Sequence, residues 1–387
     1  GGYIFRYTHY VLFIQEIFLF RYILTLLLCS AFSILWACEL GKQHYEEPSK
    51  QDRELPNESW LWLVGRTEQS GLIEAIDRKQ SVLMPSLVPI SEDAVLRVWG
   101  DRLFVINRYT HDNIQVLDAG TRRLVKQFSV GAGSNPQDVV VVGEKLYVSC
   151  LGLASIQVYS TKTWSKLGEI SLAELSERTG KSCSISEDCV GELCVEGVCT
   201  SDSLPELARM HLFQGRYLFV MAQRLLRKKN FSPGAKGALA VIDTVKDQWI
   251  GTIELAGENP VTWQFMPERE ELMIAQVGKW ADHSGSPLLD GVLQSVSLRS
   301  RRALDVRVRE KDLGGGMGAF ALVGDHLWMI RTGKNWRTEL VTYDLERKRL
   351  GKTWMSSNCV GGVSCFSFTD IVAESTDAVD GGVHFLL

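Results

Sequence analysis

Six of the nine cysteines are clustered, and clustered thiols have two common uses in proteins. They are Cys183, Cys189, Cys194, Cys199, Cys359 and Cys365. Such cysteines either form disulfides or bind a metal, with zinc the usual choice for four thiolates. Structural zinc sites favour C-x2–4-C pairs, whereas the first four cysteines are separated by five, four and four residues. In an exported protein we therefore expect disulfides, and four cysteines allow three pairings between which the sequence does not choose.

A further cysteine ends an apolar segment near the N-terminus. Residues 21–38 read RYILTLLLCSAFSILWAC, in which Arg21 precedes an apolar run of the length found in secretory signals. Its end, Leu35-Trp36-Ala37-Cys38, resembles the lipobox of bacterial lipoproteins. The resemblance implies that Cys38 receives a diacylglycerol and becomes the first residue of the mature protein.

The N-terminal part of the chain therefore predicts the cellular location of the protein. Residues 1–37 are interpreted as signal peptide and upstream hydrophobic segment, and residues 38–58 as a polar tether. The alternatives are another cleaved signal or an uncleaved membrane anchor. All three place the body outside the cytoplasm, and the lipobox predicts the periplasmic or cell-surface side of a bacterial envelope. Since Met84 is the first methionine, we expect a fragment or a non-standard start codon.

The remaining residues show no recognisable catalytic or cofactor motif. No two of the seven histidines have the spacing of a zinc-binding H-E-x-x-H, and there is no G-x-S-x-G or phosphate-binding G-x-x-x-x-G-K-[ST]. The run Gly314-Gly315-Gly316 precedes a strand and not a helix, so it lacks the helix N-terminus that would face a phosphate. We therefore expect no catalytic residue, no metal and no cofactor.

Candidate binding residues lie in predicted loops. Two basic runs, at 224–229 and 299–309, are either solvated turns or a patch for an anionic envelope component. Aromatic residues and histidines of the long loops either form a binding face or are partly buried there. The candidate binding-face residues are Tyr109, His111, Arg227, Lys228, Lys229, Trp280, His283 and Trp336.

The composition is that of an ordinary globular protein. Of 387 residues, 45% are hydrophobic and 23% charged, and the formal net charge is −4. This excludes collagen-like and disordered chains and gives no general basic surface for nucleic acid.

A four-part unit recurs from residue 59 onward. Its first half is an apolar strand, a tight turn and a second apolar strand, at 94–108, 139–151, 208–223 and 319–332. Its second half is a third strand, a polar turn and a fourth strand, at 72–83, 113–128, 155–170, 238–253, 293–308 and 339–354. A period of about 40–50 residues with four strands per unit is typical of a β-propeller. Residues 59–387 are therefore predicted to form this all-β fold, with a cysteine-rich insertion at 173–204.

The number of blades depends on the ends of the chain. Residues 368–373 and 383–387 read as the first two strands of a further unit. Seven four-stranded blades with the last incomplete fits best, and six blades closed by both termini is the alternative.

One unit is close enough to a known repeat for a family to be named. Residues 131–170 resemble the repeat of YVTN-type, YncE-like propellers. The matching residues are Pro136, Gly143, Tyr147, Val148, Ile156, Gln157, Val158, Tyr159 and Thr161. The resemblance implies an extracytoplasmic seven-bladed propeller, but this fold carries binders and enzymes alike.

The expected function is binding without catalysis. We expect a lipid-anchored scaffold whose partner is an envelope protein or an anionic envelope component. The alternatives are a lactonase-like hydrolase with a central metal and a structural subunit of a larger envelope complex.

Overall fold

The computed structural model describes most of the repeated region of the chain. The described residues are 60–66, 71–77, 82–85, 88–176, 178–182, 184, 193–195, 198–200, 204–227, 230–279, 287–333 and 338–355. Lipidation of Cys38, the tether and the segments at 368–373 and 383–387 all lie outside them. No helix among the described residues is long and apolar enough to cross a membrane.

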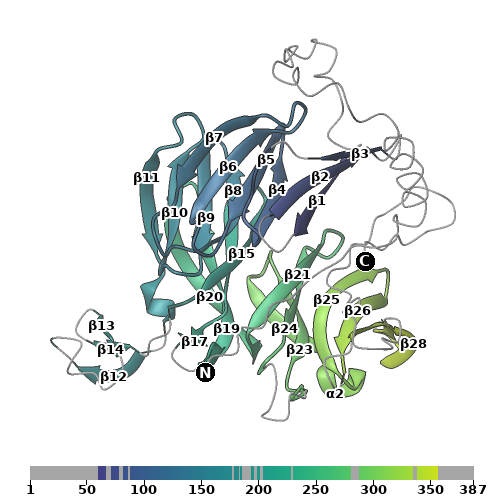
Figure 1. The fold of residues 1–387 in the computed structure, drawn as a ribbon. Helices are drawn as coiled ribbons and strands as arrows, with labels where there is room; N and C mark the ends of the chain where they lie inside the picture. The colour runs from purple at the N-terminus through teal and green to yellow at the C-terminus, as the bar shows by residue number, and fades with distance from the viewer. Residues whose placement is uncertain are drawn as a thin grey trace, which may run out of the picture.

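The strands form six successive antiparallel sheets (Figure 1). The first three sheets contain β1 (Trp60–Arg66), β2 (Gly71–Asp77) and β3 (Val82–Pro85); β4 (Ala94–Trp99), β5 (Arg102–Asn107), β6 (Asn113–Asp118) and β7 (Leu124–Ser129); and β8 (Pro136–Val142), β9 (Lys145–Cys150), β10 (Ser155–Ser160) and β11 (Lys166–Ser171). The next three contain β15 (Leu207–Phe213), β16 (Tyr217–Ala222), β19 (Lys236–Asp243) and β20 (Gln248–Glu258); β21 (Pro260–Met266), β22 (Glu271–Gln276), β23 (Val292–Ser297) and β24 (Arg302–Arg309); and β25 (Gly316–Val323), β26 (His326–Thr332), β27 (Thr338–Asp344) and β28 (Arg349–Met355).

The tight turns have the backbone that their sequence predicts. Gly100 and Gly143, each between the first and second strand of a sheet, have φ of 57° and 58°. A side chain would strain this left-handed conformation, whereas glycine adopts it readily. The four predicted first-to-second strand hairpins and all six predicted third strands are confirmed.

Each sheet packs face to face on the next, which makes the fold a β-propeller. One buried cluster joins the second and third sheets through Phe104, Ile114 and Val148, and another joins the third and fourth through Tyr147, Ile156 and Leu218. Similar clusters join the first sheet to the second, the fourth to the fifth and the fifth to the sixth. A single blade cannot bury both of its faces, so the hydrophobic core lies between blades.

The described residues include six blade sheets, of which the first has three strands, besides the sheets β12-β14-β13 and β17-β18. The choice between six and seven blades depends on residues 368–373 and 383–387 and so stays a prediction.

The sheets have two ends, which we call the turn face and the loop face. The turn face consists of the turns 100–101, 119–123, 143–144, 161–165, 214–216, 244–247, 267–270, 298–301, 324–325 and 345–348, with the strand residues next to them. The loop face consists of the loops between second and third strands and the connections between sheets.

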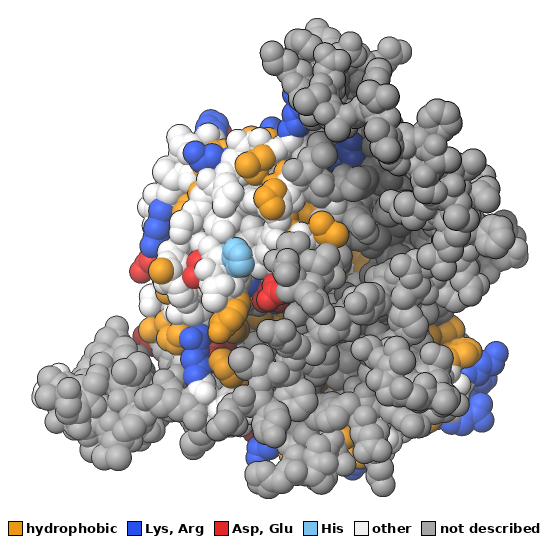
Figure 2. Space-filling model, in the orientation of Figure 1, with side chains coloured by type: hydrophobic (Ala, Val, Ile, Leu, Met, Phe, Trp, Pro, Cys, Tyr) orange, Lys and Arg blue, Asp and Glu red, His pale blue; other side chains and the backbone are white. Residues whose placement is uncertain are grey.

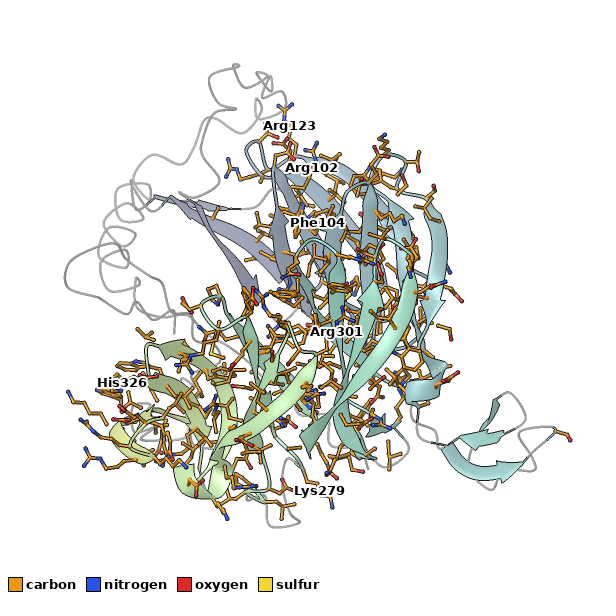
Figure 3. The ribbon with its side chains drawn as sticks, turned by 180° about the vertical axis from the view of Figure 1, so that it is seen from behind. Arg102, Phe104, Arg123, Lys279, Arg301 and His326 are labelled. Atoms are coloured by element: carbon orange, nitrogen blue, oxygen red, sulfur yellow. The ribbon has the colours of Figure 1, made fainter. Side chains whose placement is uncertain are left out.

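Contacts between sheets confirm that the turns share one end. The Tyr147 hydroxyl donates to the Thr244 carbonyl at 3.2 Å, which joins the third sheet to a turn of the fourth. The Arg301 guanidinium lies 4.0 Å from the centroid of the Tyr217 ring, which joins the fifth sheet to the fourth. Arg269 pairs with Asp325 across the fifth and sixth sheets. In Figure 3, Arg102 and Arg123 lie together at one end of their sheet, and Lys279 of the loop face lies at the far end of the molecule.

The cysteine-rich insertion is a small separate sheet. After a 3-10 turn (Ala173–Leu175), strands β12 (Arg178–Ser182), β13 (Leu193–Val195) and β14 (Val198–Thr200) pair in the order β12-β14-β13. The backbone register places Cys194 opposite Cys199. The insertion stands away from the blades in both ribbon views (Figures 1 and 3).

Three short elements complete the connections at the loop face. A hairpin of β17 (Leu225–Leu226) and β18 (Ser232–Pro233) lies between β16 and β19, and helix α2 (Glu310–Leu313) joins the fifth sheet to the sixth. The α2 residue Glu310 is buried and accepts hydrogen bonds from the backbone N–H groups of Gly291 and Met317. The acid therefore holds the connection in place, although burial raises its pKa.

Candidate functional site

A pocket opens between the first strands of three neighbouring blades. These inner strands are β4, β8 and β15, and the cavity between them has a volume of about 290 Å³. Val139 and Val141 form an apolar wall, and Arg97 and His211 supply the charged and titratable groups. Trp99, at the turn end of β4, lies at the opening with 46% of its surface exposed. The pocket could therefore hold a small, largely apolar group or a side chain of a partner.

One carboxylate ties the three inner strands together. Asp138 is the only Asp or Glu in β4, β8 and β15. It accepts a hydrogen bond from Arg97 Nε at 2.6 Å and from the Met210 backbone N–H at 2.8 Å. Its side chain is 2% exposed. Because both carboxylate oxygens are engaged, Asp138 acts as a link between blades and not as a free base.

His211 is the titratable group of the pocket wall. Its ring lies 4.4 Å, centroid to centroid, from the ring of Phe265 on the first strand of the fifth sheet. Burial lowers the pKa of His211 below its usual 6.5. The imidazole is therefore neutral at pH 7 and contributes a flat, weakly polar surface. His211 therefore lies in the pocket wall, between the first strands of the fourth and fifth sheets.

Two of the candidate binding-face residues come together on the loop face. Tyr109 is 69% exposed, and His111 is exposed beside it, with its ring Nδ1 3.4 Å from the Tyr109 carbonyl oxygen. The loop is held by Asp112, whose carboxylate accepts N–H groups of Gly133 and Asn135, each at 2.7 Å. This pair is a small aromatic projection that a partner can contact.

Arg227 has an internal role. Its Nε donates to Glu206 at 2.9 Å, and its guanidinium also donates to the Leu151 carbonyl. Glu206 is fully buried and accepts the Leu225 N–H at 2.7 Å. Arg227 therefore neutralises a buried acid and links the third blade to the fourth. These contacts between distant residues are not visible in the sequence.

The two basic runs lie at opposite ends of their sheets and do not form one patch. Residues 224–227 belong to the loop between β16 and β19 on the loop face, whereas Arg299, Arg301 and Arg302 belong to the turn between β23 and β24. The candidates outside the described residues are Lys228, Lys229, Trp280, His283, Trp336, Cys183, Cys189, Cys359 and Cys365. Within the described part of the chain, no group of three or more His, Cys, Asp or Glu is placed to hold a metal ion.

The pocket itself was not apparent from the sequence. Arg97, Asp138 and His211 are 41 and 73 residues apart along the chain. The sequence signal that could have found them is their shared position on first strands, since first strands of successive blades line the propeller axis.

Comparison with known proteins gives matches among solved structures alone. No protein family and no curated protein matches the chain. Among solved structures, the chain is similar to Kuenenia stuttgartiensis hydrazine synthase, with a TM-score of 0.49 and 14% sequence identity over 78% of this chain and 84% of that one.

Proposed function

We propose that this β-propeller is a lipid-anchored, extracytoplasmic scaffold of a bacterial envelope that binds a partner without catalysing a reaction. A diacylglycerol on Cys38 would hold the chain to a membrane. Residues 38–58 would form a flexible tether between the lipid and the propeller. The segment 21–38 and the repeat at 131–170 support this extracytoplasmic location.

The observation that carries the proposal is the state of Asp138. A propeller hydrolase needs acids or metal ligands that face its axis. Here the single carboxylate of the three inner strands that form the pocket is engaged by Arg97 and Met210. What remains is an apolar wall with a neutral histidine, which suits binding.

The loop face supplies the second surface for a partner. Tyr109 and His111 project there, and the cysteine-rich insertion leaves the blades from the connection between β11 and β15 at the same end. Disulfides among the clustered cysteines would hold the insertion together, since so short a segment buries little core. An envelope protein or an anionic envelope component is the expected partner.

Native mass spectrometry of the protein extracted from its own membranes tests this function. The expected result is a chain that starts at Cys38 with a diacylglycerol mass, oxidised clustered cysteines and no small molecule or metal. A Cys38→Ser variant should lose the lipid mass and leave the membrane fraction. A metal or organic mass released on denaturation would contradict the proposal and favour the enzyme, and an unprocessed N-terminus would contradict the lipid anchor.

A further inference from the structure

The turn face carries basic residues that have no acidic partner among the described residues. These are the exposed side chains of Lys246, Arg302, Lys348 and Arg349, none of which forms an ion pair with another described residue. They belong to the third-to-fourth strand turns of three successive sheets, the fourth, fifth and sixth. The charge is therefore spread over one side of the ring and not confined to one turn.

Most acids on this face are already neutralised. Asp118 pairs with Arg102 at 3.1 Å, Asp243 with Arg216 at 2.6 Å and Glu270 with Arg299 at 2.6 Å. Asp247, Asp325 and Asp344 are likewise paired, with Lys145, Arg269 and Arg347. Glu346, exposed in the turn 345–348, forms no ion pair with a described residue and offsets one of the four cations. The turns between third and fourth strands therefore keep a smaller excess of positive charge in a chain of net charge −4.

Exposed apolar side chains stand on the same face. Val245, next to Lys246, is 72% exposed, and Trp99 and Val323 are 46% and 36% exposed at two other turns. Figure 2 shows one side of the molecule, on which basic side chains lie mainly along the edge of the described surface and apolar side chains lie between them. Isolated apolar residues at turn tips beside unpaired cations are the pattern of proteins that rest on a lipid surface, because cations meet headgroups while Trp and Val enter the interface.

The chain also enters the propeller at this face. β1 begins at Trp60, which pairs with Asp77, the last residue of β2, so both lie at the turn between β2 and β3. The opposite end of β2 is on the loop face, where the Gly71 N–H donates to Ile90 in the connection to β4. An anchor upstream of residue 60 would therefore hold the turn face, and not the loop face, nearest the membrane.

We propose that the turn face docks on an anionic lipid bilayer through Lys246, Arg302, Lys348 and Arg349, with Val245 and Trp99 in the interface. The docked propeller then presents the loop face and the insertion away from the membrane. The orientation rests on the proposed anchor, whereas the docking contacts do not.

Hydrogen exchange of the full-length protein on vesicles tests the docking. The protein is measured on phosphatidylcholine vesicles with and without phosphatidylglycerol. We expect slower exchange in the turns around Trp99, Val245 and Val323 only when phosphatidylglycerol is present. The protection should disappear between about 0.1 M and about 1 M NaCl, as the Debye length falls from ~10 Å to ~3 Å.

A charge variant and a matched control distinguish docking through the turn face from nonspecific electrostatic attraction of the whole protein to the membrane. Each basic residue at an anionic membrane contributes roughly fivefold to binding, so the variant K246Q/R302Q/K348Q/R349Q should lower the ratio of docked to undocked protein by several hundredfold. The control K126Q/K236Q/K279Q/K311Q removes the same charge from exposed side chains away from the turn face. It should leave the protection of the turns unchanged.

The alternative outcomes are distinct. Equal loss in both variants, or protection without phosphatidylglycerol, would overturn the docking proposal. Protection produced by soluble polyphosphate without vesicles would assign the face to a soluble polyanion, which also overturns it. Two other measurements test the lipid anchor independently of docking. A chain without the diacylglycerol mass, or one that is released from phosphatidylcholine vesicles, would show that the anchor is absent.

Discussion

Arg97 Nε and Asp138 Oδ1 are 2.6 Å apart and join the first strands of two neighbouring blades beside the central pocket. Asp138 reaches a third blade through the Met210 N–H. The pair is therefore the point at which the second, third and fourth blades are held in register around the axis.

Removal of the Asp138 carboxylate should destabilise the protein strongly. Asp138→Ala leaves the Arg97 guanidinium and a buried N–H without their acceptor, and we expect a loss of about 2–4 kcal/mol in the free energy of unfolding. Guanidinium chloride denaturation measures this loss. Asp101→Ala, at a side chain that is 74% exposed, is the control and should change stability by less than about 0.5 kcal/mol. Equal effects of the two substitutions would show that the link between blades is not important.

Arg227 should behave as a stabilising residue and not as a binding one. Arg227→Gln removes the ion pair that the guanidinium forms with the fully buried Glu206, and the expected loss of unfolding free energy is about 2–3 kcal/mol. Lys279→Gln, at an exposed residue of the same face, should cost almost nothing. Thermal unfolding of both variants checks the difference. A stable R227Q protein that has lost its partner would return Arg227 to the binding face.

His211 should make stability depend on pH. Its pKa in the folded protein lies below 6.5 because burial disfavours the charged ring. The unfolded chain therefore binds more protons than the folded one just below pH 6.5, and stability falls as pH decreases from 6.5 to the folded pKa. Below that value the loss is complete. The difference in melting temperature between the wild type and His211→Gln, measured from pH 7.5 to pH 5, should shrink over this window, and a constant difference would contradict the assignment.

Cys150 should stay unreactive until the protein unfolds. It is buried, and burial raises the pKa of its thiol to about 12, so almost no thiolate is present at pH 8. Iodoacetamide labelling followed by peptide mass spectrometry should leave Cys150 unmodified in the native protein and modify it in denaturant. If the clustered cysteines are oxidised as predicted, they stay unmodified in both conditions without a reductant. Labelling of Cys150 in the native protein would show that β9 opens.

The arrangement of strands could be predicted because its signals are local. Third strands end at polar turns, as at Asp118 and Asp243, and the predicted hairpins between first and second strands have glycine-containing turns such as Gly100-Asp101. Alternating apolar residues then assign the buried side of a strand, and the spacing of the units assigns the propeller. The sequence predicts no hairpin of first and second strands at 260–276, where the structure has β21 and β22.

The roles of single charged residues depended on contacts between blades. In the sequence Arg227 is one of a run of cations, and only the fold places the buried Glu206 against it. Asp138 likewise has no distinguishing neighbour along the chain, yet it meets Arg97 and Met210 across two interfaces. Local sequence therefore determined that the chain forms repeated four-stranded blades, because turn chemistry and hydrophobic alternation act over a few residues. Only the tertiary structure decided which charges are neutralised and which face solvent, because the packing of one blade on the next brings together residues that are far apart in the chain.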